Sequence, residues 1–184
     1  MNTDTTIRDH STFRIILQGM SHPGKVYALP DLSGKESSAV ELLGCLMDNE
    51  VKFAVLGDTD LEAVLVRHTD SRPTSVEDAD FVIACNGTTN GRLVSFNRGS
   101  LEYPDKGATI LYLVEELSEN EGEITLSGPG INGKAVLRIS GLPLSELHLL
   151  GQVNREFPLG IDAIFLDRSG SIVCIPRSSH IGVN

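Results

Sequence analysis

The densest group of side chains able to bind an anion lies close to the end of the chain, at Arg177, Ser178, Ser179 and His180. A guanidinium fork and hydroxyl donors match the oxygens of a phosphate-like anion. The group directly follows Pro176, which lacks the backbone donor that a continuing sheet ladder needs. The pattern predicts an oxyanion-binding cluster at the end of a strand, although polar residues in such places often only cap the backbone.

A β-hairpin is expected to position this cluster. Residues 163–166 are apolar with β-branched and aromatic side chains, which indicates a buried strand. The segment 167–170, Asp-Arg-Ser-Gly, is typical of a tight turn, so residues 171–175 should return antiparallel. Asp162 stands at the entrance of the first strand, where it could orient an imidazole or receive a proton. An aspartate near a glycine at a strand entrance more often caps a turn.

A second candidate is the loop 86–91, Asn-Gly-Thr-Thr-Asn-Gly, which follows the apolar segment 81–85. Open α/β sheets bind ligands in such loops, and the backbone donors could hold a phosphate. The loop is neither G-x-G-x-x-G nor a Walker A sequence, so an ordinary surface turn is the favoured interpretation. No two histidines have the helical spacing of a zinc site, and no G-x-S-x-G hydrolase motif is present.

The elements between these candidates alternate between helix and strand. The chain has 184 residues, 40% of them hydrophobic, which suffices for one domain with a core. Ser11 is a good N-cap, so residues 1–10 are predicted to be a disordered tail and 11–184 a single domain. Thr59 and Glu62 form a predicted capping box. The fold class is therefore α/β, a single-domain mixed β-sheet with helices on both faces. Helices are expected near 11–20, 38–49, from 59, and 143–153, and strands at 26–29, 51–56, 81–85, 109–114, 123–126 and 135–140.

Charge and cysteine content limit the binding partners and the cell compartment that we expect for the protein. Fifteen basic against twenty-five acidic residues give a net charge of -10, which opposes binding to nucleic acid or to an anionic membrane. No signal peptide and no apolar run of about 18 residues is visible, so a soluble cytoplasmic protein is expected. Cys45, Cys85 and Cys174 lie far apart in apolar segments, which indicates reduced core thiols rather than disulfides or metal ligands.

Two motifs of the chain resemble the C-terminal signature of the PhnH family, a subunit of the bacterial carbon-phosphorus lyase system. They are Phe-Pro-Leu-Gly-Ile-Asp at 157–162 and Ile-Pro-Arg-Ser-Ser-His at 175–180. Further segments are similar to the family pattern in the right order, so the resemblance covers nearly the whole chain. These segments are 13–14, 20–24, 99–109 and 126–131.

The resemblance implies an accessory subunit in the catabolism of organic phosphonates. The machinery couples a phosphonate to the ribose C1 of a nucleoside triphosphate before a different subunit cleaves the carbon-phosphorus bond. It also implies a fold similar to the large domain of pyridoxal-phosphate (PLP) transferases. No lysine lies in a recognisable lysine loop, so we expect neither PLP nor another cofactor or metal. Arg14, in the first family segment, joins Arg177, Ser178, Ser179, His180 and Asp162 as predicted anion-binding residues.

Other carbon-phosphorus lyase subunits and a phosphonate or nucleotide-like anion are the expected partners, with a homodimer when the chain is alone. Two alternatives remain at this point. One is a self-sufficient enzyme that acts on a phosphorylated substrate with the loop 86–91 and Asp162. The other is a purely structural assembly module, in which Arg177 pairs with a carboxylate of a partner.

Overall fold

A seven-stranded mixed sheet forms the centre of the protein. The computed structural model describes residues 3–30 and 38–183. Five strands of the sheet run parallel, while β9 is antiparallel to β8 and β1 is antiparallel to β9. The predicted mixed sheet and the predicted hairpin of residues 163–175 are thereby confirmed. In spatial order the strands are β1 (Tyr27–Ala28), β9 (Ser171–Ile175), β8 (Asp162–Leu166), β5 (Thr109–Leu113), β4 (Phe81–Ala84), β2 (Lys52–Leu56) and β3 (Arg72–Pro73).

A second, three-stranded antiparallel sheet consists of β10 (His180–Val183), β6 (Glu116–Ser127) and β7 (Ala135–Ser140). The sequence predicted the cores of β6 and β7 but not a separate sheet, and it did not predict β10. β6 is longer than expected because its pairing with β7 continues past an irregularity between Glu119 and Ile124. The chain after Pro176 therefore turns once and forms a further strand.

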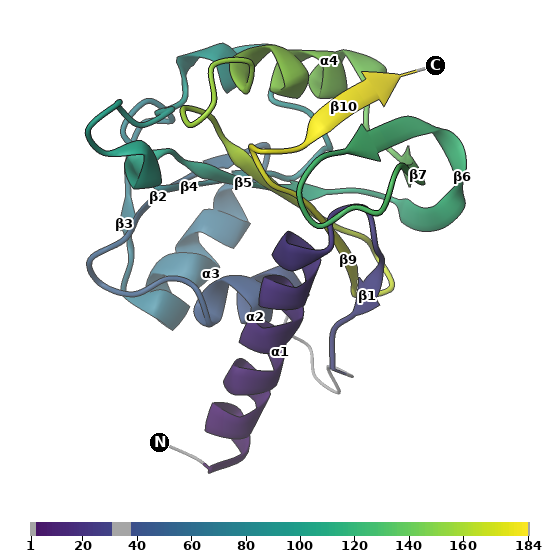
Figure 1. The fold of residues 1–184 in the computed structure, drawn as a ribbon. Coiled ribbons are helices and arrows are strands. Elements are labelled where there is room, and N and C mark those ends of the chain that lie inside the picture. Colours follow the sequence, from purple (N-terminus) through teal and green to yellow (C-terminus); the bar gives the residue numbers. More distant parts are fainter. Residues whose placement is uncertain (1–2, 31–37, 184) are drawn as a thin grey trace.

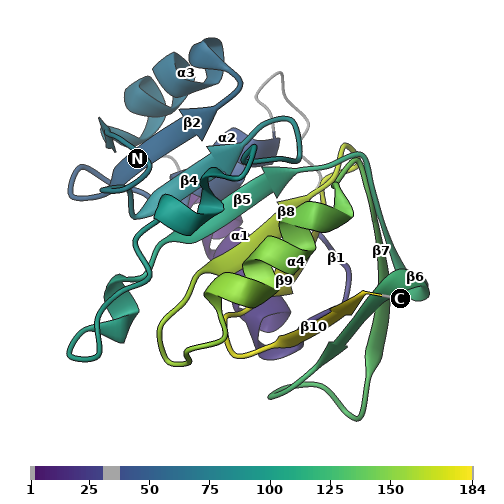
Figure 2. The ribbon, with the colours of Figure 1, turned by 90° about the horizontal axis from the view of Figure 1, so that it is seen from above.

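Helices cover both faces of the large sheet, as predicted. Figure 1 shows α1, α2 and α3 on one face and α4 on the other, with the small sheet beside α4. The view from above in Figure 2 places α4 in front of β8 and β9. The helices are α1 (Thr3–Ser21), α2 (Ser38–Gly44), α3 (Thr59–Thr69) and α4 (Leu144–Val153), with 3-10 turns η1 (Arg92–Ser95) and η2 (Pro104–Lys106).

Three helix boundaries differ from the prediction. α1 begins at Thr3, so Ser11 is not its N-cap, and residues 3–10 are helical rather than a disordered tail; residues 1–2 lie outside the described part. α2 ends at Gly44, earlier than expected. The N-cap of α3 is Asp58, whose carboxylate accepts from two backbone amides of the first turn. An aspartate caps as well as the predicted Thr59, so the local sequence offered two equivalent starts.

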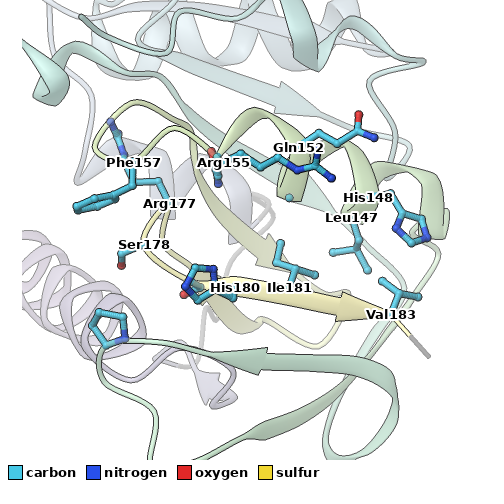
Figure 3. Close-up of a pocket in the computed structure, with 14 residues that line it drawn as sticks. Leu147, His148, Gln152, Arg155, Phe157, Arg177, Ser178, His180, Ile181 and Val183 are labelled. Carbon is cyan, nitrogen blue, oxygen red and sulfur yellow. The ribbon is translucent and has the colours of Figure 1, made fainter. Parts of the chain in front are cut away.

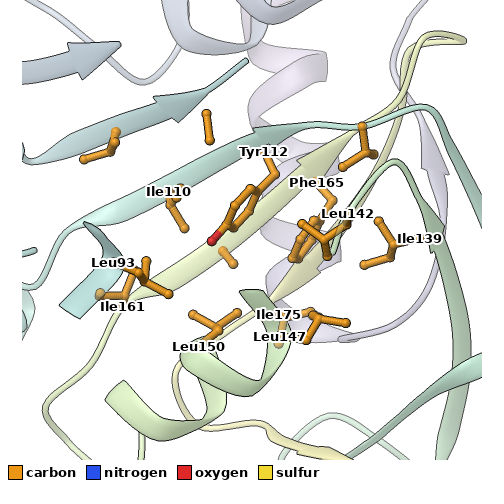
Figure 4. Packing of buried hydrophobic residues seen from close by; sticks show 14 of the residues in the cluster. Leu93, Ile110, Tyr112, Ile139, Leu142, Leu147, Leu150, Ile161, Phe165 and Ile175 are labelled. Atoms are coloured by element: carbon orange, nitrogen blue, oxygen red, sulfur yellow. The ribbon is translucent and has the colours of Figure 1, made fainter. Parts of the chain in front are cut away.

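The alternation of side chains along the central strands builds one hydrophobic core on each face. Ile110 and Tyr112 of β5 and Phe165 of β8 point toward α4 and the small sheet, where Leu147 and Leu150 pack against them (Figure 4). The intervening residues point the other way, into a second core formed with the first three helices. This packing fixes α4 over the sheet, and with it the cleft described below.

Candidate anion-binding cleft

A cleft of about 690 Å³ lies between the end of α4 and the segment that leads from β9 into β10. Figure 3 shows side chains from both elements facing this space. It opens near the beginning of β8, so it lies at the amino ends of the parallel strands and not at their carboxyl ends. The polar lining residues that matter for chemistry are His148, Arg155, Arg177, Ser178, Ser179 and His180.

The lining of the cleft contains basic side chains, of which Arg177 is paired with Asp162. Arg155 and Arg177 lie in it together with His148 and His180, whereas no aspartate or glutamate of the described chain lines it. The whole protein carries a net charge of -10, so this composition runs against the average field. An arginine without an acidic partner among the described residues, as Arg155 is, favours the approach of an anion when it lies in a concave site.

Arg177 lines the cleft, but most of its donors are used within the chain. Its Nε donates to Asp162 Oδ2 at 3.1 Å and its Nη2 to the same oxygen at 2.6 Å. Nη1 donates to the carbonyl oxygen of Pro104 at 2.6 Å, and Nη2 also reaches the Gly107 carbonyl at 3.3 Å. The Arg177 backbone amide donates to Asp162 Oδ1 at 2.8 Å. The guanidinium fork thus joins the hairpin to the loop before β5, and these contacts use four of its five N–H donors.

Ser179 is one of the buried polar residues of the cleft. It is 5% exposed, and its Oγ has no hydrogen-bond partner within the part of the chain that the structure describes. Its backbone amide donates to the Pro176 carbonyl at 2.9 Å, which closes the turn before β10. Ser178 is half-buried and His180 is exposed. Residues 178–180 therefore present hydroxyl and imidazole groups along one side of the cleft.

Comparison with known proteins identifies the family to which the chain belongs. Residues 2–182 match the family described as "Bacterial phosphonate metabolism protein (PhnH)". The chain belongs to this family. It is 34% identical over 181 residues to HtxG of Stutzerimonas stutzeri, which is named as a C-P lyase subunit protein; the match covers 96% of this chain and 87% of the relative. It is 28% identical over 186 residues to the subunit PhnH of alpha-D-ribose 1-methylphosphonate 5-triphosphate synthase from Rhizobium meliloti (strain 1021), covering 97% and 92% respectively.

The two motifs that resemble PhnH meet in the folded chain. Asp162 closes the first motif and Arg177 lies in the second, and the two side chains form an ion pair. Among the described residues, Asp162 therefore contacts an arginine and no imidazole, and it caps the turn through the Arg177 amide. The two motifs together form one wall of the cleft. The Asp162–Arg177 ion pair holds them together, because it joins the end of β9 to the beginning of β8.

Arg14 is not brought to the cleft. It lies exposed on α1, on the face of the large sheet opposite to α4, and it does not line the cleft (Figure 1). The structure instead adds three side chains that the sequence had not suggested, His148, Arg155 and Phe157. His148 and Arg155 lie on or just after α4, where helical spacing alone could not show which face meets the C-terminal segment.

The loop 86–91 binds an anion of the protein itself. The carboxylate of Glu146, 4% exposed, accepts from Thr89 N at 2.9 Å, Thr89 Oγ1 at 3.0 Å and Thr88 Oγ1 at 2.8 Å. Tyr112 Oη donates to the same group at 2.8 Å. Burial, reinforced by the adjacent Glu146, raises the pKa of Tyr112 well above its usual range. The loop is thus neither a phosphate site nor an ordinary surface turn, since Thr89 is only 1% exposed.

The remaining candidates for chemistry are the three cysteines and possible metal ligands. All three cysteines are free, and burial raises the pKa of Cys174 to about 12 and those of Cys45 and Cys85 to about 11, so the thiols are protonated near neutral pH. Within residues 3–30 and 38–183, no three histidine, cysteine, aspartate or glutamate side chains are placed to share a metal ion. None of the helices in the described segments has the length and apolarity needed to cross a membrane.

Proposed function

We propose that this chain is an accessory subunit of the bacterial carbon-phosphorus lyase machinery. It would act in the step that couples a phosphonate to the ribose C1 of a nucleoside triphosphate, and would contribute a ligand-binding surface and assembly contacts rather than a complete active site. Membership of the PhnH family over residues 2–182 supports this proposal, as does the naming of two relatives as subunits.

The observation that carries the ligand-binding part is the cleft with basic side chains at the amino ends of the parallel strands. Arg155, Ser178, Ser179 and His180 surround it, and no described acidic residue lines it. Arg177 and Asp162 belong to the site as its scaffold, because their side chains are paired with each other. Arg14 would serve a separate surface, since it lies on the other face of the sheet.

The two rival functions are less well supported. A self-sufficient enzyme built on the loop 86–91 would need its donors free, but Glu146 accepts from Thr88 and Thr89. It would also need Asp162 unpaired, whereas Asp162 binds Arg177. A purely structural module that offers Arg177 to a partner's carboxylate meets the same objection, because the guanidinium is already occupied within the chain.

Five finer statements belong to the proposal. The fold is similar to the large domain of PLP transferases, for which the mixed sheet covered on both faces is a necessary condition. No PLP is used. The described residues, from Thr3 onward, act as one domain that contains a large and a small sheet. In isolation the chain pairs with a second copy, and it works in the cytoplasm, where the three free cysteines stay reduced.

Co-expression tests the subunit role. The chain is expressed with the products of its neighbouring genes and purified by a tag on one of those products. We expect a stable assembly that converts a phosphonate and a nucleoside triphosphate only when this chain is present, and no turnover by the chain alone. Turnover by the purified chain, or its absence from the assembly, would overturn the proposal. Sedimentation of the isolated chain at several concentrations tests the dimer.

A further inference from the structure

We infer that the cleft between α4 and the C-terminal segment is a binding site for an amphiphilic oxyanion, an anionic tetrahedral group attached to an apolar or aromatic body. Arg155 and the polar residues 178–180 hold the anion, and Arg177 is a positioning residue. Phe157 at one end of the cleft and Ile181 and Val183 at the other offer apolar contacts for the body (Figure 3). This inference deepens the proposed ligand-binding role and rests on it.

Arg155 is the cation available to an external ligand. It lies exposed just after the end of α4, and no described residue forms a hydrogen bond or ion pair with its guanidinium. Arg177, by contrast, uses all three guanidinium nitrogens within the chain. A free guanidinium beside a site without acidic residues gives an oxyanion a bidentate partner at no loss of an existing ion pair.

The hydroxyl of Ser179 is a second, independent sign of a ligand. Buried polar atoms are almost always paired, so an unpaired one in a cleft wall calls for a missing partner. Ser179 Oγ is buried, lines the cleft and has no partner in the described structure. Ser178 and His180 on either side add donors at the same wall. An oxygen of a tetrahedral anion placed against this wall would satisfy the hydroxyl.

The apolar part of the lining shows that the ligand is more than a bare anion. The Phe157 side chain is 64% exposed, and Ile181 and Val183 of β10 are half-buried. In Figure 3, Phe157 lies at the end near Arg177, whereas Val183 lies at the other end. The volume of about 690 Å³ falls within the range of roughly 300–1,000 Å³ found for sites that bind organic molecules. A single inorganic phosphate would leave this apolar surface in water.

Calorimetric titration of the isolated full-length chain tests the site, with inorganic phosphate and phenylphosphonate as probes. We expect phenylphosphonate to bind about tenfold more tightly than phosphate, because its ring packs against Phe157. Arg155→Ala should weaken both probes by about tenfold or more, since a charged hydrogen bond is lost. Arg168→Ala removes a guanidinium that is 80% exposed at the far turn of the hairpin, and it should leave both affinities unchanged.

A second pair of variants separates the two halves of the site. Phe157→Ala should weaken phenylphosphonate binding and leave phosphate binding unchanged, whereas Tyr103→Ala, at an aromatic ring that is 59% exposed outside the cleft, should affect neither probe. The inference is overturned if neither probe binds saturably, if phosphate binds as tightly as phenylphosphonate, or if Arg155→Ala leaves both affinities intact. A chain that binds neither probe but still joins the assembly would refute the ligand site and leave the subunit role standing. A chain that binds the probes but does not join the assembly would support the ligand site and refute the subunit role.

Discussion

Replacing Arg177 with alanine should destabilise the protein by about 2–4 kcal/mol. Breaking a buried ion pair by removing one partner costs about 3–5 kcal/mol, because the remaining charge is left without compensation. The side chains of Arg177 and Asp162 are 13% and 24% exposed, so water can reach the abandoned carboxylate in part and the lower range applies. The variant also loses the donors to the Pro104 and Gly107 carbonyls, so the loop before β5 should become more mobile.

Urea unfolding followed by far-ultraviolet circular dichroism gives the loss of stability, and hydrogen exchange gives the mobility of residues 99–107. Arg177→Lys keeps the charge but not the fork, so it should recover only part of the free energy. A double-mutant cycle with Asp162→Asn should show a coupling of about 1 kcal/mol or more. A loss below about 1 kcal/mol for Arg177→Ala, with unchanged exchange in the loop, would refute the assignment of Arg177 as a positioning residue.

Three further predictions concern other parts of the fold. Glu146→Ala leaves several buried donors unpaired and should lower the free energy of unfolding by roughly 3–5 kcal/mol. Tyr112→Phe removes a single hydrogen bond to this carboxylate and should lower it by only about 1 kcal/mol. Equal losses for the two variants in urea unfolding would contradict the hydrogen-bond network around the Glu146 carboxylate. The raised pKa of Cys174 means that the folded state keeps this proton longer than the unfolded state, so stability should fall as pH rises from 9.0 toward about 12. Comparison of urea midpoints at about pH 7 and about pH 10 should show a smaller fall for Cys174→Ala. Asp58→Ala should cost about 1 kcal/mol by thermal unfolding, and an unchanged midpoint would argue against Asp58 as the cap of α3.

The sequence predicted the central sheet well because the signal for it is local. Residues 163–166 and 171–175 are apolar runs on either side of an Asp-Gly turn, and the structure has them as β8 and β9 in the expected pairing. The strands at 81–85 and 109–114 are apolar along their whole length because the sheet is covered on both faces, and such runs are recognised without knowledge of their partners.

The cleft could be predicted only in part, because its two walls are distant in sequence. The C-terminal wall was visible as a dense polar group, yet its arginine pairs with Asp162. Arg155 and His148 carry no local signal, since their role depends on where α4 packs across the sheet. β10 was missed for a similar reason, because its residues become a strand through pairing with β6, more than fifty positions earlier. Tertiary contacts of this kind override local propensity.

Glu146 also occupies the place where folds of this kind often bind small molecules. Its carboxylate accepts hydrogen bonds from the loop 86–91, which follows the carboxyl end of β4, so these donors are already used within the chain. α4, which is ten residues and so about 15 Å long, runs from this edge of the sheet toward Arg155 at the other. An affinity handle or fluorophore attached at the exposed Asn90 would therefore stand about a helix length away from an incoming ligand, which makes that position a natural point for immobilising the protein.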